Sequence, residues 1–357
     1  MPRAKKKSLE FDDVFGLDDL IGAVPDPGVK EKQNQSKEVK QKENKKLDRV
    51  TEIMDQMMTG ILSMFGVDEI YDKLAPEVEK RFREEFGCIP KIHTVVDSKG
   101  VEHSLSGITH EMFDTVLNLI NLRIPVYMSG LSGTGKNVIA KQVAQALGLE
   151  FYFTNAVTQE YKLTGFIDAS GKYHETQFYK AFTQGGLFFL DEMDASIPEV
   201  LVILNAAIAN GYFDFPTGKV TAHPNFRVIA AGNTLGTGAD SQYTGRYCLD
   251  RASLDRFAVV HIDYSPAIDM EMCGGDQELY KFITAFRLAT SKTGIQCVCS
   301  YRSADRIHTL DATHIADMKT IMRMSLIKDL DVDDIKILYN EVKKIVNNRF
   351  TEGLNQV

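Results

Sequence analysis

The spacing of apolar residues predicts a parallel sheet in the middle of the chain. Short apolar runs alternate there with stretches of helical periodicity. The runs predict strands at 125–128, 150–153, 186–190, 226–231 and 258–262. Strands joined by helical crossovers pair in parallel and are covered by helices on both faces. The expected fold is therefore a three-layer α/β domain.

The segments around this domain carry other patterns. Helical spacing is expected at 47–66 and 76–86, and 91–96 and 101–105 predict a hairpin around a turn at 97–100. Thr109 is the expected N-cap of a helix that ends near Leu122. Beyond Asp263 we expect helices at 276–292, 303–310, 316–327 and 332–348. The predicted division is 1–46, 47–108, 109–263 and 264–357, and the last part is a small helical lid domain.

The first 46 residues are expected to form a disordered tail. Residues 28–46 contain only two apolar side chains, Val29 and Val39. So little apolar surface does not offset the entropy of ordering, which predicts a flexible tether. Before it, apolar residues such as Phe11 and Phe15 lie among aspartates. Two interpretations stay open for this part: a segment that folds onto a partner, or an acidic tail with incidental apolar residues.

Composition and charge narrow the class of protein. The 357 residues are 44% hydrophobic and 25% charged, as in globular proteins, with a formal net charge of −8. The tail carries +2 and the remainder −10, which disfavours non-specific binding of nucleic acid by the body of the chain. Neither a membrane-spanning apolar run nor a signal-peptide core is evident. Five scattered cysteines favour a reducing compartment, so a cytoplasmic location is expected and no membrane contact.

A glycine-rich segment follows the first predicted strand of the sheet and opens a predicted helix. Backbone amides in such a loop face phosphate oxygens, and the lysine supplies positive charge. The expected nucleotide-binding residues are Gly130, Leu131, Ser132, Gly133, Thr134, Gly135, Lys136, Asn137 and Val138. Asn137 stands where a Ser or Thr hydroxyl usually ligates Mg²⁺. Its amide oxygen is the expected substitute ligand.

Two carboxylates end the strand predicted at 186–190. Asp191 and Glu192 follow its apolar run about fifty residues after the glycine-rich loop. In phosphoryl-transfer enzymes with these two motifs, the first carboxylate holds Mg²⁺ and the second polarises the attacking water. Asp191 is therefore expected to bind metal together with Asn137, and Glu192 to act in catalysis.

With these motifs the sequence resembles the AAA+ ATPases, and among them the MoxR and cobaltochelatase small-subunit (CobS-like) branch, which includes phage-encoded copies. The resemblance covers about 109–311. It implies that Asn233, at the end of a strand, is the sensor that positions water. It also implies that Arg256 is a finger reaching the neighbouring subunit's nucleotide and that Arg302 is the second sensor. Arg246 and Arg251 are alternatives for the finger.

The resemblance implies an ATP hydrolase with ATP and Mg²⁺ as cofactors. It further implies a homo-oligomeric ring, a hexamer, that remodels or matures a protein partner, which in this branch is frequently a von Willebrand A domain protein. Segments 163–173 and 213–220 resemble inserts that grip the substrate, although ordinary surface hairpins are the alternative. The first insert lacks the Gly-Ala-Phe-Thr-Gly-Ala loop of sigma-factor activators, which disfavours that function.

Two other functions stay open. One is a nucleic-acid-directed motor like the GTP-dependent restriction translocases of the McrB type, for which hairpin lysines such as Lys219 and the basic tail would supply charge. The other is a nucleotide-dependent assembly factor with little turnover, because Asn137 weakens the expected Mg²⁺ site. The residues do not distinguish ATP from GTP, nor do they fix the size of the ring.

Overall fold

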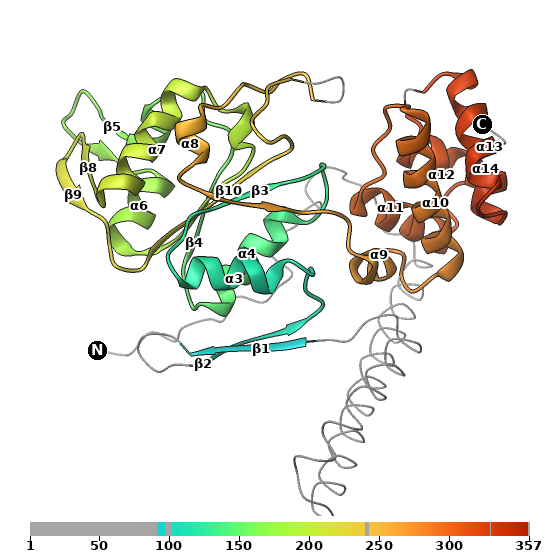
Figure 1. The fold of residues 1–357 in the computed structure, drawn as a ribbon, viewed down its shortest axis with the longest axis horizontal. Helices are drawn as coiled ribbons and strands as arrows, with labels where there is room; N and C mark the ends of the chain where they lie inside the picture. Colours follow the sequence, from blue (N-terminus) through green and yellow to red (C-terminus); the bar gives the residue numbers. More distant parts are fainter. Residues whose placement is uncertain (1–90, 97–101, 240–242, 329, 356–357) are drawn as a thin grey trace, which may run out of the picture. The chain divides into compact units, whose positions relative to one another are not determined.

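A computed structural model describes residues 91–96, 102–239, 243–328 and 330–355 (Figure 1). The expected tail at 1–46, the helices expected at 47–66 and 76–86, and the turn at 97–100 lie outside these residues. Within the described part, no helix is long and apolar enough to cross a membrane.

Among the described residues, five parallel strands form the central sheet. They are β3 (Val126–Ser129), β4 (Phe151–Thr154), β7 (Gly186–Leu190), β10 (Phe226–Gly232) and β11 (Ala258–His261). The order across the sheet is β11-β3-β10-β7-β4, and each neighbouring pair is parallel. The five predicted strands and their parallel pairing are confirmed.

Helices pack on both faces of the sheet, so its central strands are buried on both sides. Phe189 of β7 packs in one apolar cluster with α3 (Phe113–Asn121) and α4 (Lys136–Ala146). Its neighbour Phe188 packs in a second cluster with α6 (Gln177–Gln184) and α7 (Pro198–Asn210). Successive strand residues point to opposite faces, so two adjacent phenylalanines serve two cores. The three-layer α/β fold expected for an AAA+ domain is confirmed.

The predicted N-cap of α3 is wrong. The helix begins at Phe113, its N-cap residue is Met112, and no side-chain oxygen caps it. Thr109 lies three residues before that N-cap. A histidine side chain accepts a backbone hydrogen bond just before the helix instead: the Met112 N–H donates to His110 Nδ1 at 3.0 Å. The other ring nitrogen of His110 then donates to the carbonyl oxygen of Asp263 at 2.7 Å.

In the part of the chain that the structure describes, three antiparallel hairpins lie outside the central sheet. They are β1 (Lys91–Val96) with β2 (Glu102–Gly107), β5 (Phe166–Ile167) with β6 (Tyr173–His174), and β8 (Tyr212–Phe215) with β9 (Gly218–Thr221). Short α5 (Tyr161–Thr164) precedes β5, a 3₁₀ turn, η2 (Met193–Ala195), follows β7, and α8 (Arg251–Leu254) precedes β11. The hairpins at both expected inserts are thus present.

The chain after β11 is helical and has its own core. It comprises α9 (Pro266–Met272), α10 (Gln277–Thr293), α11 (Tyr301–Thr313), α12 (Met318–Ser325), α13 (Val332–Lys343) and α14 (Arg349–Asn355). Phe282 and Phe286 of α10 are fully buried with Phe350 of α14. The single helix predicted at 332–348 ends early at Lys343, and Asn348 begins a new one by accepting the amide hydrogens of Phe350 and Thr351 at 3.1 Å.

Removing the ring of Phe189 should destabilise the protein strongly. Phe189 is fully buried, so Phe189→Ala creates a cavity and should lower the free energy of unfolding by about 3–5 kcal/mol. Urea denaturation measures the change. The control Val202→Ala alters a side chain of α7 that is 59% exposed and should change that free energy by less than about 0.5 kcal/mol. Equal effects of the two variants would contradict the two-sided core.

Candidate active site

The predicted motifs meet at the carboxyl edge of the sheet. The glycine-rich loop follows β3, and Lys136 is the first residue of α4. Asn233 follows β10, and Asp191 follows β7. Because β10 lies between β3 and β7, Asn233 falls between the loop and the carboxylates. Open α/β sheets bind ligands at this edge.

Lys136 is a buried charge at this edge of the sheet. Its side chain is 6% exposed, and Nζ donates to the carbonyl oxygens of Gly130 and Leu131 at 2.7 and 2.9 Å. It also donates to Asn233 Oδ1 at 3.2 Å. Burial lowers the pKa of Lys136 to about 8, against the opposing effect of Asp191 and Asp194. Within the described residues Lys136 has no ion-pair partner, so the ammonium is held by neutral oxygens alone.

The loop needs glycine at two places. Gly133 and Gly135 have φ of 75° and 87°, which side chains rarely adopt. A Cβ on Gly133 would also lie 2.5 Å from Cβ of Ser300, the residue before α11. These glycines therefore allow both the turn of the loop and its close contact with the helical lid.

Asn137 and Asp191 are in direct contact. Asn137 Nδ2 donates to Asp191 Oδ2 at 2.8 Å, and Oδ1 of Asp191 accepts the amide hydrogen of Glu192 at 2.9 Å. An amide oxygen and a carboxylate are hard ligands that suit Mg²⁺. Among the described residues no group of three or more His, Cys, Asp or Glu side chains is arranged to hold a metal. A divalent ion at this pair would therefore take its remaining ligands from phosphate and water.

Glu192 has an unusual backbone and a cationic neighbour. Its φ of 51° is left-handed, a conformation that costs energy in a non-glycine residue and clusters at functional sites. Arg246 Nη2 lies 3.2 Å from Glu192 Oε1. The second nitrogen of the same guanidinium, Nη1, lies 3.4 Å from Asp194 Oδ1. Arg246 thus contacts two carboxylates of its own chain.

Asp194 is a buried residue that the sequence reasoning missed. Its side chain is inaccessible to solvent, and Oδ2 accepts hydrogen bonds from Asn233 N, Thr234 N and Thr234 Oγ1 at 3.0, 2.9 and 3.0 Å. Thr234 has a second partner, because the Tyr127 hydroxyl donates to its carbonyl oxygen at 2.7 Å. Burial, with Asp194 nearby, raises the pKa of Tyr127. The one signal in the sequence is a third carboxylate soon after the strand.

The part of the chain that carries these residues is similar to known proteins. Residues 125–257 match the family model of the AAA domain of the dynein-related subfamily. This part of the chain is therefore similar to AAA domains. Uncharacterized proteins of Staphylococcus aureus strains USA300, COL and Mu50 are 28% identical over 170 residues, which cover 43% of this chain and 60% of each relative. The matched region thus spans less than two thirds of these relatives.

Solved structures of NtrX from Brucella abortus are also similar to this chain. One covers 52% of this chain and 42% of NtrX at 18% identity, with a TM-score of 0.38. A second, in complex with ADP, covers 65% of this chain and 49% of NtrX at 16% identity, with a TM-score of 0.36.

The helical lid reaches the glycine-rich loop of the α/β domain at Ser132. Arg302 Nη2 donates to Ser132 Oγ at 3.2 Å, and the Tyr264 hydroxyl donates to the Ser132 carbonyl oxygen at 3.1 Å. From the other side, the Ser132 amide donates to the Tyr243 hydroxyl at 2.9 Å. The predicted residue Arg302 is therefore at the site, whereas Tyr243 and Tyr264 were not predicted.

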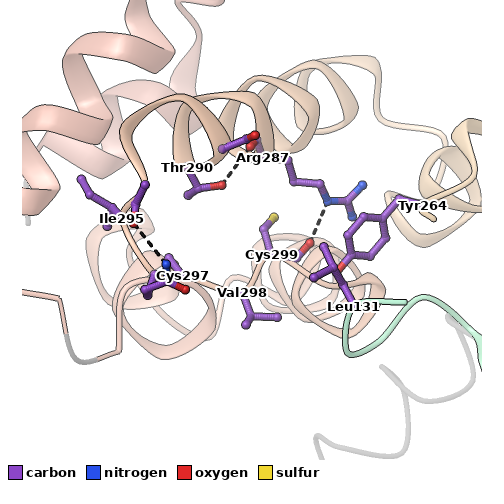
Figure 2. Close-up of a pocket in the computed structure, with 11 residues that line it drawn as sticks. Leu131, Tyr264, Arg287, Thr290, Ile295, Cys297, Val298 and Cys299 are labelled. Atoms are coloured by element: carbon purple, nitrogen blue, oxygen red, sulfur yellow. Dashed lines mark hydrogen bonds between the residues drawn. The ribbon is translucent and has the colours of Figure 1, made fainter. Parts of the chain in front are cut away.

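A cavity of about 330 Å³ lies between this loop and the lid. Figure 2 shows Leu131 of the loop and Tyr264 on one side, and the end of α10 with residues 294–299 on the other. Arg287 holds this wall together: Nε donates to the Cys299 carbonyl oxygen at 2.7 Å, and the guanidinium pairs with both oxygens of Asp269 at 2.5 and 2.8 Å. Movement of the lid would therefore reshape a cavity that the loop lines.

Arg256 does not join the site within one chain. It follows α8, and its Nη1 donates to the Ala252 carbonyl oxygen. Arg251, the first residue of α8, is exposed. Arg246, the other finger candidate, already contacts two carboxylates of its own chain. The structure therefore separates Arg246 from the two arginines of the α8 region.

Phosphate binding should weaken as the pH rises through 8. Below the Lys136 pKa of about 8 the side chain is an ammonium that attracts anions. Above this pKa Lys136 is neutral in the free protein and must take up a proton when phosphate binds, which lowers the affinity. The affinity for ADP should be constant from pH 6.8 to 7.5 and fall several-fold by pH 9. Calorimetric titration measures it, with Lys136→Met as the control that binds weakly at every pH. The same slope in Lys136→Met would refute the assignment.

Proposed function

We propose that this chain hydrolyses ATP with Mg²⁺ at its AAA domain. The observation that supports this most is the buried Lys136, an ammonium that has only neutral partners among the described residues and lies on the same edge as Asp191 and Glu192. A buried charge without a counter-ion is costly. A phosphate group beside the loop would supply that counter-ion.

The loop and the first turn of α4 would hold the nucleotide. Amides of Gly130 to Val138 and the positive end of α4 would face the phosphates, and Lys136 would turn from the loop carbonyls to the terminal oxygens. Asn137 and Asp191 would hold Mg²⁺, with the Asn137 amide turned so that its oxygen faces the ion. When bound, Mg²⁺ would neutralise charge on the phosphate oxygens.

Glu192 and Asn233 would act on the attacking water. Glu192 would take a proton from water as its oxygen bonds to the γ-phosphorus, while the bond from that phosphorus to the bridging oxygen breaks and ADP leaves. Glu192 then returns the proton to solvent. Asn233, whose Oδ1 already contacts Lys136, would hold the water in line.

The active unit would be a homo-oligomeric ring, which we propose is a hexamer. Arg256 would reach the nucleotide of the neighbouring subunit, as the resemblance implies. Among the described residues, no hydrogen bond or ion pair joins Arg256 or Arg251 to the nucleotide motifs of its own chain, so both would be available to a neighbouring subunit. Such fingers contribute roughly 10³ to 10⁵ to the rate in related phosphoryl transfer. Arg302, already in contact with Ser132, would couple the lid to the nucleotide.

The work of the ring would be remodelling of a protein partner, as in the MoxR and CobS-like branch, where a von Willebrand A domain protein is the expected class. Support comes from the hairpins, where Phe166, Ile167 and Tyr212 are each more than 40% exposed. Exposed apolar side chains suit contact with polypeptide. The motor directed at nucleic acid is less favoured, because Lys219 lies over the ring of Tyr212 at 3.8 Å.

Replacing Glu192 by Gln should abolish turnover and spare binding. The amide keeps the shape of the side chain but takes no proton, so steady-state phosphate release should fall by about 100-fold or more. ADP affinity by calorimetry should stay within about threefold. Glu199→Gln, at an exposed position at the start of α7, is the matched control. Retained turnover in Glu192→Gln would contradict the assignment.

The low-turnover alternative is testable at Asn137. Its amide occupies Asp191 Oδ2 at 2.8 Å, which favours a weak metal site if the amide does not turn. If Asn137 is an adequate ligand, Asn137→Ser should change the maximal rate at saturating Mg²⁺ by less than about threefold. Phosphate release over a Mg²⁺ titration measures this. An increase of tenfold or more would favour an assembly factor with little turnover.

A further inference from the structure

Arg246 connects an exposed carboxylate to a buried one. Its guanidinium lies 3.2 Å from Glu192 Oε1 and 3.4 Å from Asp194 Oδ1. The Arg246 side chain is 11% exposed and that of Asp194 is inaccessible, whereas the Glu192 side chain is 41% exposed. Arg246 therefore extends from a buried anchor to an exposed acid.

The anchor is fixed to the end of β10. Asp194 Oδ2 accepts the amide hydrogens of Asn233 and Thr234 at 3.0 and 2.9 Å, together with the Thr234 hydroxyl at 3.0 Å. Three hydrogen bonds on one oxygen leave the carboxylate no alternative orientation. The other oxygen faces Arg246, which supplies the positive charge that a buried carboxylate requires.

Glu192 has no comparable support of its own. Among the described residues, Arg246 is the one side-chain partner of its carboxylate, and the contact uses Oε1 only. An exposed glutamate without a partner samples several rotamers. A base must hold its oxygen within hydrogen-bond reach of the water, so this freedom would slow proton transfer.

We infer that Arg246 is a positioning residue for hydrolysis: it holds Oε1 of Glu192, leaves Oε2 to accept the proton of the water, and fixes Glu192 relative to Asn233 through Asp194. The inference rests on the proposed function, in which Glu192 and Asn233 share that water. The base, the water-positioning amide and the buried carboxylate then form one rigid group.

A purely structural role for Arg246, as counter-ion of Asp194, predicts a different result for Arg246→Lys. The lysine keeps a positive charge beside Asp194, so the protein should fold. A single ammonium lacks the fork that lets a guanidinium hold two carboxylates. If Arg246 only balanced the charge of Asp194, lysine would restore full activity.

The experiment compares the kinetics of Arg246→Lys with those of the unsubstituted chain. We expect kcat for ATP to fall about 10-fold or more, while KM and ADP affinity stay within about threefold. Arg349→Lys is the matched control, because Arg349 also contacts several carboxylates, Asp276, Glu278 and Asp311, but lies in the lid. Its kcat should be unchanged.

A second background shows whether Arg246 acts through Glu192. In Glu192→Asp the shorter acid no longer reaches Arg246, so adding Arg246→Lys should lower the residual kcat by less than about threefold. Wild-type kcat in Arg246→Lys, or equal losses in both backgrounds, would overturn the inference. Neither result would touch the proposed function, which Glu192→Gln tests separately.

Discussion

A closed circuit of polar contacts around the carboxyl edge of the sheet holds the candidate site together. Lys136 Nζ donates to the side-chain oxygen of Asn233, and the backbone N–H of Asn233 donates to Asp194. Arg246 then pairs with both Asp194 and Glu192. The circuit closes through Asp191, which binds the Glu192 amide and the side chain of Asn137, the residue after Lys136. Each of these residues contacts the next one in the circuit. The strand order β3-β10-β7 makes this possible, because it places these three strand ends side by side.

The loop that carries Lys136 is linked to the lid at Gly133, whose carbonyl oxygen accepts the Tyr301 amide hydrogen at 3.4 Å, and at Ser132. Ser132 contacts Arg302 and Tyr264 with its side chain and carbonyl oxygen, while its amide contacts Tyr243. Tyr243 lies three residues before Arg246 in the chain. A ligand that rearranges Ser132 would therefore act on the lid and on the segment that carries Arg246 together. This gives a physical route from phosphate binding to lid position, and the cavity beside Leu131 would change shape with it (Figure 2).

Local pattern was enough to predict the sheet and the loop. The central strands β3 and β7 are continuous apolar runs because they are buried on both faces, and the glycines of the loop are required by its backbone and its contact with Ser300. Asp194 and Arg246 were different. They are 52 positions apart and meet only when β7 and β10 pair, so neither residue carries a local sign of its partner. The cap of α3 failed for a similar reason, since His110 depends on Asp263 across the fold.

Phosphate release from ATP by the purified chain, measured with Mg²⁺ over a wide range of protein concentration, tests the central claim most directly. If hydrolysis requires the buried lysine, the paired carboxylates and an arginine from a second copy, turnover per chain should rise steeply with concentration, in parallel with assembly measured by light scattering. Chelation of Mg²⁺ should abolish it. An assembled chain that binds ATP with Mg²⁺ and releases no phosphate, or turnover per chain that stays constant from monomer to assembly, would contradict the account.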